Sequence, residues 1–261
     1  MASTEVPTAT LTGGAAMPLL GLGTWQAHGG DAYKAVQKAL EVGYRHIDTA
    51  TMYRNEDEVG RAVRESGLPR DEVFVTTKLP AEAGERAQET IEASLRAMGL
   101  DFVDLWLIHW PPNGTASPQT WKRVLSAREQ GLAREVGVSN YSTAQLDELA
   151  NATGEMPSVN QIEWGPSLYD AEVVAGHEER GVVLEGYSPF KTTNLKDPVL
   201  TGIADEHGKN AAQVVLRWHL QHGFVAIPKS THDDRIAANF DVFDFELTDD
   251  EIAAIDGLGE S

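Results

Sequence analysis

Short apolar runs rich in β-branched residues alternate along the chain with longer amphipathic stretches. Apolar positions spaced i, i+3 and i+4 within 35–40 are typical of a helix, whereas the run LWLI at 105–108 is typical of a buried strand. The pattern predicts strands at 20–24, 46–49, 73–78, 102–109, 135–139, 158–163, 182–187 and 225–228. It predicts helices at 32–42, 56–65, 86–98, 118–130, 143–150, 172–179, 210–221 and 233–239.

Strands alternating with helices in this way are typical of parallel βαβ units. We therefore expect the α/β class and a (β/α)8 TIM barrel, with an N-terminal hairpin (9–11 against 18–20, turning at Gly13 and Gly14) and a short C-terminal tail. A doubly wound sheet is disfavoured, because Gly21-Leu22-Gly23 lacks the third glycine of the dinucleotide fingerprint. The 261 residues suit one barrel of roughly 250, so we expect a single domain over residues 1–261.

Composition excludes several function classes. The chain has no cysteine, which excludes thiolate catalysis, disulfides and cysteine-ligated metal centres. A net charge of −19 disfavours nucleic acid and anionic membranes as partners. The start of the chain lacks the features of a signal peptide, and no apolar run approaches the ~20 residues of a membrane span. We expect a cytoplasmic protein with no metal, since no metal-binding motif is present, and no sustained heptad seam argues against a monomer.

Polar side chains stand where several predicted strands end, which is where (β/α)8 barrels carry their chemistry. Asp48 and Tyr53 follow the second barrel strand, Lys78 ends the third and His109 ends the fourth. Taken singly, each has a structural explanation: a helix cap, a loop aromatic, a solvated lysine and a core histidine. Taken together, they place an acid, a phenol, an ammonium and an imidazole at the ends of adjacent strands.

Those four groups suit carbonyl reduction, which needs a hydride at carbon and a proton at oxygen. A phenol with a pKa near ~10 is a weak acid at neutral pH. We expect the Lys78 ammonium to lower the pKa of Tyr53, and Asp48 to orient Lys78 and keep it charged. His109 would hold the carbonyl oxygen in line or relay protons. This hypothesis makes Tyr53 the proton donor.

Longer motifs carry a family resemblance. GYRHIDTA (43–50), YRNE (53–56), TTKL (76–79), DLWLIHWP (104–111), GVSN (137–140), VNQIE (159–163), GYSP (186–189) and the IPKS…R…N pattern (227–239) resemble the aldo-keto reductases, in family order over nearly the whole chain. The ending DVFDFELTDDEIAAIDGL resembles the bacterial 2,5-diketo-D-gluconate reductase branch. The resemblance implies NADPH-dependent reduction of aldehydes and ketones, such as 2,5-diketo-D-gluconate or methylglyoxal, to alcohols.

The same resemblance implies roles for individual residues. Asp48, Tyr53, Lys78 and His109 would be the catalytic set. The cofactor would contact Gly23, Thr24, Trp25 and Asp48 beside the nicotinamide ribose, Ser139, Asn140 and Gln161 at the carboxamide, Tyr187 on the ring, Ser188, Pro189, Phe190 and Lys191 along the pyrophosphate, and Lys229, Ser230, Thr231, Arg235 and Asn239 at the adenosine. The substrate would contact Trp25, Tyr53, His109 and Trp110, with Trp164 as a further candidate for the aromatic mouth.

Cofactor choice follows from charge. Lys229 and Arg235 offer a point cation and a planar fork, which suit a 2′-phosphate and favour NADPH over NADH. The branch that the chain resembles often has an arginine where His232 stands and an acidic residue where Ala238 stands. We therefore expect some use of NADH.

Two further departures concern the pocket. Many relatives have an aromatic residue or leucine and then histidine after VNQIE, whereas this chain has Trp164-Gly165. We expect Gly165 to open space there. The loop at 111–117 and the tail beyond Leu258 are short, which predicts an open pocket for small carbonyl compounds.

Two other functions fit a barrel of this kind. One is a non-catalytic, nicotinamide-binding regulatory barrel, which would bind NADPH without turnover. The other is a barrel isomerase or hydrolase, which would bind no nicotinamide.

Overall fold

A computed structural model describes residues 6–259. Eight parallel strands lie in the order β3-β4-β5-β6-β7-β8-β9-β10. Bridges from Leu20 to Ala226 and from Gly23 to Lys229 join the first of these strands to the last, so the sheet closes on itself. The strands are β3 (Leu22–Gly23), β4 (His46–Asp48), β5 (Phe74–Leu79), β6 (Val103–Ile108), β7 (Ala133–Ser139), β8 (Val159–Glu163), β9 (Val183–Tyr187) and β10 (Val225–Ile227).

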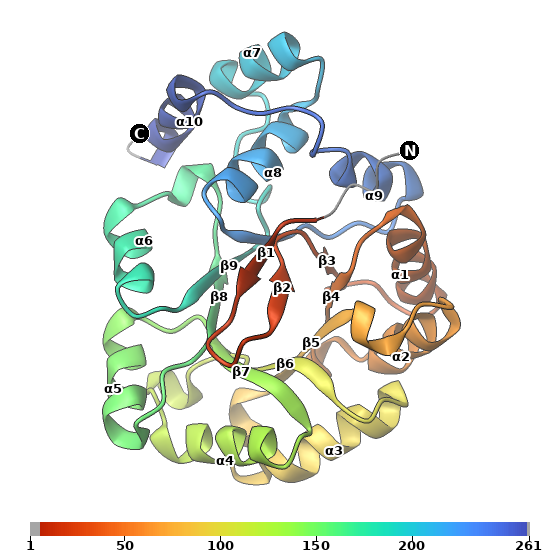
Figure 1. The fold of residues 1–261 in the computed structure, drawn as a ribbon, viewed down its shortest axis with the longest axis vertical. Helices are drawn as coiled ribbons and strands as arrows, with labels where there is room; N and C mark the ends of the chain where they lie inside the picture. The colour runs from red at the N-terminus through yellow and green to blue at the C-terminus, as the bar shows by residue number, and fades with distance from the viewer. Residues whose placement is uncertain (1–5, 260–261) are drawn as a thin grey trace.

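Helices surround this sheet on its outside (Figure 1). They are α1 (Gly30–Val42), α2 (Glu56–Glu65), α3 (Ala87–Met98), α4 (Pro118–Glu129), α5 (Thr143–Thr153), α6 (Ala171–Glu178), α7 (Pro198–His207), α8 (Ala211–Gln221), α9 (Asp233–Phe240) and α10 (Asp249–Asp256). Short 3-10 turns are η1 (Thr51–Tyr53), η2 (Arg70–Glu72), η3 (Ala81–Arg86), η4 (Pro112–Gly114), η5 (Pro166–Leu168) and η6 (Gly257–Gly259). The predicted (β/α)8 barrel is confirmed.

Two helices were not predicted. α7 and α10 lie together outside α8 at one edge of the barrel (Figure 1). Both have recognisable N-terminal caps: the Asp197 carboxylate accepts a hydrogen bond from the Val199 N–H, and Thr248 and Glu251 form a capping box. Of the short C-terminal tail expected beyond Leu258, Gly259 belongs to η6 and the rest lies outside the described residues.

The N-terminal hairpin exists, with a different register from the predicted one. β1 (Thr8–Thr10) pairs with β2 (Ala16–Pro18), rather than 9–11 with 18–20. Leu20 is unavailable to the hairpin because it pairs with Ala226 of the barrel. The Glu135 carboxylate, at the start of β7, accepts a hydrogen bond from the Ala15 N–H at 3.3 Å and holds the turn against the barrel. The hairpin crosses one end of the barrel (Figure 1), which leaves the other end for the carboxyl termini of the strands.

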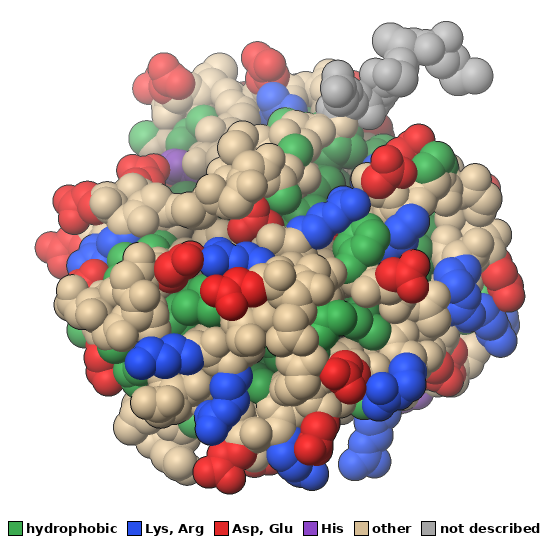
Figure 2. Space-filling view, turned by 60° about the horizontal axis from the view of Figure 1, so that its bottom comes forward, with side chains coloured by type: hydrophobic (Ala, Val, Ile, Leu, Met, Phe, Trp, Pro, Cys, Tyr) green, Lys and Arg blue, Asp and Glu red, His purple; other side chains and the backbone are tan. Residues whose placement is uncertain are grey.

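Apolar side chains fill the barrel and its contacts with the helices. Most belong to one cluster, and a second cluster lies under α7 and α8 around Trp164, Trp218 and Phe224. On the face drawn in Figure 2, Lys and Arg side chains are interspersed with Asp and Glu side chains. None of the helices between residues 6 and 259 has both the length and the apolar character that a bilayer crossing requires.

Candidate active site

A buried ion pair lies at the carboxyl end of the barrel. The Lys78 Nζ donates hydrogen bonds to both Asp48 carboxylate oxygens, at 2.6 and 2.7 Å, and to the Thr49 carbonyl at 2.8 Å. Gln161 donates a further bond to the Asp48 Oδ2 at 2.8 Å. Burial lowers the pKa of Lys78, but the charges of Asp48, Tyr53 and Glu185 outweigh it and raise that pKa above its usual value. The lysine is therefore charged, as the sequence predicted.

Tyr53 stands over this pair. Its ring centroid lies 5.1 Å from the Lys78 Nζ and 5.7 Å from the His109 ring, which it meets edge-on. The sequence predicted that the pKa of Tyr53 would be lowered, and this prediction is wrong for the sum of all contributions. Lys78 does lower the pKa of Tyr53, but burial outweighs it, and the net shift is upward. Tyr53 therefore keeps its proton across neutral pH.

The His109 imidazole is neutral. Burial and the nearby Lys78 charge lower its pKa to about 3. Its Nδ1 is buried and has no hydrogen-bond partner among the described residues. A neutral imidazole can still hydrogen-bond an incoming polar group through its other ring nitrogen, Nε2, without adding a charge.

These side chains lie at the floor of a pocket of about 450 Å³. Of the predicted residues, its lining includes Gly23, Trp25, Asp48, Tyr53, His109, Trp110, Ser139, Asn140, Gln161, Tyr187, Ser188, Lys191 and Lys229. It also includes Met52, Glu163 and Ile227, which the sequence analysis missed although Met52 adjoins Tyr53 and the other two stand at the end or the start of a quoted motif. Lys78 lies beneath the lining, fully buried.

The mouth of the pocket is apolar. Trp25, Met52 and Trp110 are 49%, 54% and 49% exposed, which is unusual for large apolar side chains, and all three line the pocket. Trp164 is a correction to the predicted mouth. It is buried and packs edge-on against Phe224 and near Tyr169 in the second apolar cluster.

Gly165 also departs from expectation, because the glycine opens no space. A Cβ added there would lie 2.9 Å from the Pro189 carbonyl oxygen and 3.0 Å from the Thr193 hydroxyl. The loop after β9 occupies the room that a larger side chain would need. Gly165 thus lets that loop approach β8 closely.

One wall of the pocket presents a linked polar set. The Ser139 hydroxyl donates to the Gln161 carbonyl at 2.8 Å, and the Asn140 amide donates to the Ser139 hydroxyl at 2.9 Å. The Tyr187 hydroxyl donates to the Asn140 Oδ1 at 2.9 Å. Asn140 has a φ of 65°, a left-handed conformation that its short polar side chain tolerates. These contacts hold amide groups and one aromatic ring in fixed positions beside Asp48.

The loop after β9 carries the residues expected along a pyrophosphate. Ser188 lines the pocket, whereas Pro189 is buried and Phe190 packs against both apolar clusters. The Lys191 ammonium lies 2.9 Å from a Glu163 carboxylate oxygen. This ion pair spans from the loop to the end of β8, so in this structure the Lys191 charge is already balanced.

The residues expected at the adenosine follow β10. Lys229 and Arg235 are exposed, and neither has an ion pair with any residue between 6 and 259. The Ser230 hydroxyl accepts a hydrogen bond from the His232 N–H at 3.1 Å, which fixes the turn into α9. Thr231, Arg235 and Asn239 lie on that turn and helix, outside the pocket lining, and Thr24 is buried, with its hydroxyl donating to the Asp48 carbonyl.

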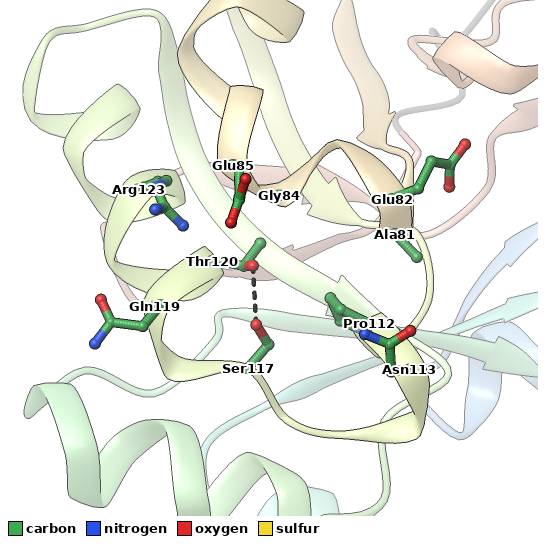
Figure 3. A pocket seen from close by; sticks show the side chains of 10 residues that line it. All are labelled: Ala81, Glu82, Gly84, Glu85, Pro112, Asn113, Ser117, Gln119, Thr120 and Arg123. Carbon is green, nitrogen blue, oxygen red and sulfur yellow. Dashed lines mark hydrogen bonds between the residues drawn. The ribbon is translucent and has the colours of Figure 1, made fainter.

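A second cavity, of about 650 Å³, lies between η3, η4 and the start of α4 (Figure 3). Its lining includes Glu82, Glu85 and Arg123 and the hydrogen-bonded pair Ser117 and Thr120. It shares no lining residue with the pocket above the Lys78–Asp48 pair. The predicted catalytic residues Asp48, Tyr53 and His109 therefore line the smaller cavity and none of them lines the larger one.

The fold agrees with comparisons to known proteins. The sequence profile described as the Aldo/keto reductase family matches residues 19–260. The chain belongs to the aldo/keto reductase family. One relative of this aldo/keto reductase, an aldo-keto reductase of Mycolicibacterium smegmatis, is 46% identical over 97% of this chain and 93% of its own length.

Two other relatives have more specific descriptions. The methylglyoxal reductase DkgA of Yersinia pestis is 42% identical over 98% of this chain and 94% of its own. The crystal structure of a Bombyx mori aldo-keto reductase in complex with NADP superposes with a TM-score of 0.89, at 36% identity over 97% of this chain and 93% of that one.

Proposed function

We propose that this aldo/keto reductase reduces small aldehydes and ketones to alcohols with NADPH, with Tyr53 as the proton donor. The observation that carries the proposal is the buried Lys78–Asp48 pair directly beneath Tyr53, with neutral His109 beside it, at the floor of a pocket with an aromatic rim. The family to which the chain belongs supports the reaction class.

In this mechanism the substrate oxygen docks between the Tyr53 hydroxyl and the His109 imidazole. Tyr53 holds a proton at neutral pH because burial raises its pKa, and the Lys78 charge stabilises the phenolate left after that proton is given up. Asp48 fixes the position of Lys78 through two hydrogen bonds. His109, being neutral, orients the carbonyl without competing as an acid.

A nicotinamide supplies the hydride to the carbonyl carbon when it is bound. The pocket residues fit such a group: amide and hydroxyl groups of Ser139, Asn140 and Gln161 suit a carboxamide, and the Tyr187 ring offers a flat face. Lys229 and Arg235, which form no ion pair within residues 6–259, suit a 2′-phosphate, which favours NADPH. The NADP found in the Bombyx mori relative supports this choice, and we expect weaker use of NADH.

The substrate class follows from the pocket. A cavity of about 450 Å³ that must also admit a nicotinamide leaves room for a small carbonyl compound, and the Trp25, Met52 and Trp110 rim favours compounds with some apolar surface. The description of the Yersinia pestis relative makes methylglyoxal the first candidate. We retain 2,5-diketo-D-gluconate as the second, because of the resemblance at the end of the chain.

The test follows NADPH oxidation with methylglyoxal, a nitrobenzaldehyde and 2,5-diketo-D-gluconate, each repeated with NADH. Tyr53→Phe is expected to lower kcat by roughly 10²–10⁴, as loss of a general acid does. Tyr33→Phe is the matched control, because its hydroxyl bonds to the exposed Glu65 at 2.6 Å, away from the pocket. Binding of NADPH with no turnover would favour the regulatory barrel, and absence of NADPH binding would favour the isomerase or hydrolase. Full activity in Tyr53→Phe would refute the proton-donor assignment.

A further inference from the structure

A second carboxyl group lies inside the barrel, next to the buried ion pair. Glu185 is in the middle of β9, beside Gln161 of β8 and Val225 of β10, and is fully buried. Neither of its carboxyl oxygens meets the geometry of a hydrogen bond with a described residue, and the polar group that favours its charged form is the Gln161 amide on the neighbouring strand. A buried carboxylate without donors is costly, so a group in this setting is either neutral or functionally placed.

The titratable groups that face Glu185 come from several elements. From β4, the His46 Nε2 lies 3.7 Å from the Glu185 Oε1, and Asp48 acts on Glu185 through its charge. Lys78 of β5 carries the one positive charge of this set, since burial and the Lys78 charge lower the pKa of His46 to about 3. Tyr53 of η1 completes the set. β10 presents only Val225, Ala226 and Ile227, while His219 of α8 packs against Gly186.

Two buried carboxyl groups thus feel the charge of a single ammonium, which is hydrogen-bonded to Asp48 and acts on Glu185 through its charge alone. Asp48 receives the two Lys78 hydrogen bonds and the Gln161 hydrogen bond, so it ionises first. With Asp48 ionised, a second negative charge nearby is disfavoured. Burial and the Asp48 charge accordingly raise the pKa of Glu185 to about 8. Glu185 is a neutral carboxylic acid at neutral pH and becomes a carboxylate in alkaline solution.

We propose that Glu185 is a positioning residue that acts through Lys78 and sets the pH at which Tyr53 loses its proton. While Glu185 is neutral, only Asp48 balances the Lys78 charge, and Lys78 can stabilise the Tyr53 phenolate. When Glu185 ionises, its charge opposes a phenolate at Tyr53 and keeps the phenol protonated to higher pH. Carbonyl reduction, which needs the protonated phenol, is thereby extended into alkaline solution. This inference rests on the proposed function of Tyr53.

The test compares pH profiles of kcat for wild type and Glu185→Gln. Near pH ~7, where Glu185 is neutral, the two are expected to differ by less than about twofold. The alkaline limb of Glu185→Gln, meaning the fall of kcat at high pH, is expected at a pH lower by on the order of one unit or more, because an ionised carboxyl group near a phenol raises the pKa of that phenol. KM for NADPH is expected to stay unchanged.

Three further variants separate charge from packing. Glu185→Met also removes the titration and requires no hydrogen bonds, so it replaces Glu185→Gln if that variant fails to fold. Glu185→Asp retains a carboxyl group and is expected to return the alkaline limb toward its wild-type position. The control is Glu135→Gln, which removes another buried carboxylate at the hairpin end of the barrel. Its alkaline limb is expected to coincide with that of wild type.

Thermal unfolding gives a readout independent of turnover. The pKa of Glu185 is raised in the folded protein above its ordinary value near ~4.3, so the wild-type protein loses stability as pH rises from that value to about 8. The Tm of wild type is expected to fall relative to that of Glu185→Gln between pH ~5 and ~8. A constant Tm difference over this range would overturn the inference.

The outcomes also separate this inference from the proposed function. A wild-type protein that reduces no carbonyl compound overturns the proposed function and this inference with it. This inference alone is overturned if the wild-type protein reduces carbonyl compounds and the alkaline limb of its kcat profile is unchanged in both Glu185→Gln and Glu185→Met. A uniform loss of kcat at every pH would show a packing role and would also overturn it.

Discussion

The Lys78–Asp48 pair allows a sharp test, because both partners are buried and bound to each other. Lys78→Met removes the charge and keeps a flexible side chain of similar length. It leaves the Asp48 carboxylate inside the barrel with the Gln161 amide as its remaining side-chain donor. Removing one partner of a buried pair costs roughly 3–5 kcal/mol, because the other charge is left uncompensated. We expect Lys78→Met to lose stability by that amount.

The loss should depend on pH in a definite direction. Burial raises the pKa of Asp48, and in Lys78→Met the opposing Lys78 charge is gone. A carboxyl group whose folded pKa lies above its unfolded value destabilises the fold increasingly as pH rises through that interval. The variant should therefore be nearest to wild type near pH ~4 and furthest from it near pH ~8. Adding Asp48→Asn removes the carboxylate charge that has lost its partner. The double variant should therefore recover most of the stability, but it should remain inactive.

Denaturant unfolding at several pH values, with turnover measured in parallel, provides the assay. Lys38→Met is the control, since Lys38 and Glu41 form an exposed pair at 3.1 Å, and pairs of that kind contribute ~0–1 kcal/mol. A Lys78→Met variant no less stable than Lys38→Met would refute the account of a buried ion pair. A double variant as unstable as the single one would show that the loss comes from packing rather than from an unpaired charge.

Three further outcomes are expected. Trp164→Ala should cost roughly 3–5 kcal/mol in denaturant unfolding, because the ring is buried, and should leave KM for the carbonyl substrate unchanged; Trp110→Ala should instead raise that KM with little loss of stability. Gly165→Ala should lower stability by roughly 1–3 kcal/mol and weaken NADPH binding measured by fluorescence, because the added methyl meets the loop after β9. The NMR signal of His109, assigned with His109→Gln, should show no titration between pH ~5 and ~8, since its pKa is about 3; a midpoint near ~6.5 would contradict the neutral imidazole.

Local pattern was sufficient for most of the architecture. The apolar periodicity placed all eight barrel strands to within a few residues, because a strand buried on both faces is recognisable in sequence. Signals for the two missed helices were also present: Pro198 follows Asp197, and Thr248 precedes Glu251 by three residues. The register of the N-terminal hairpin differs from the predicted one, because Leu20 pairs with Ala226, a partner some two hundred residues away along the chain.

The individual residues around the pocket show where sequence reasoning stopped. Trp164 was a candidate for the mouth and Gly165 for open space, but the side chain and the loop after β9 fill those places. Glu185 went unremarked, although a glutamate inside the buried run VVLEGY, two residues before Tyr187, is the signal that could have found it. What it does depends on Asp48 and Lys78, which come from other strands.

The sequence by itself determined the barrel, the family and the four side chains expected to carry the chemistry, because each follows from local periodicity or from a motif of a few residues. Tertiary structure alone decided the ionisation of those side chains. Burial outweighs the Lys78 charge at Tyr53, makes His109 neutral and keeps the Glu185 carboxyl protonated. Desolvation and charge interactions depend on neighbours that the fold assembles from distant parts of the chain, and spacing along a sequence carries no measure of them.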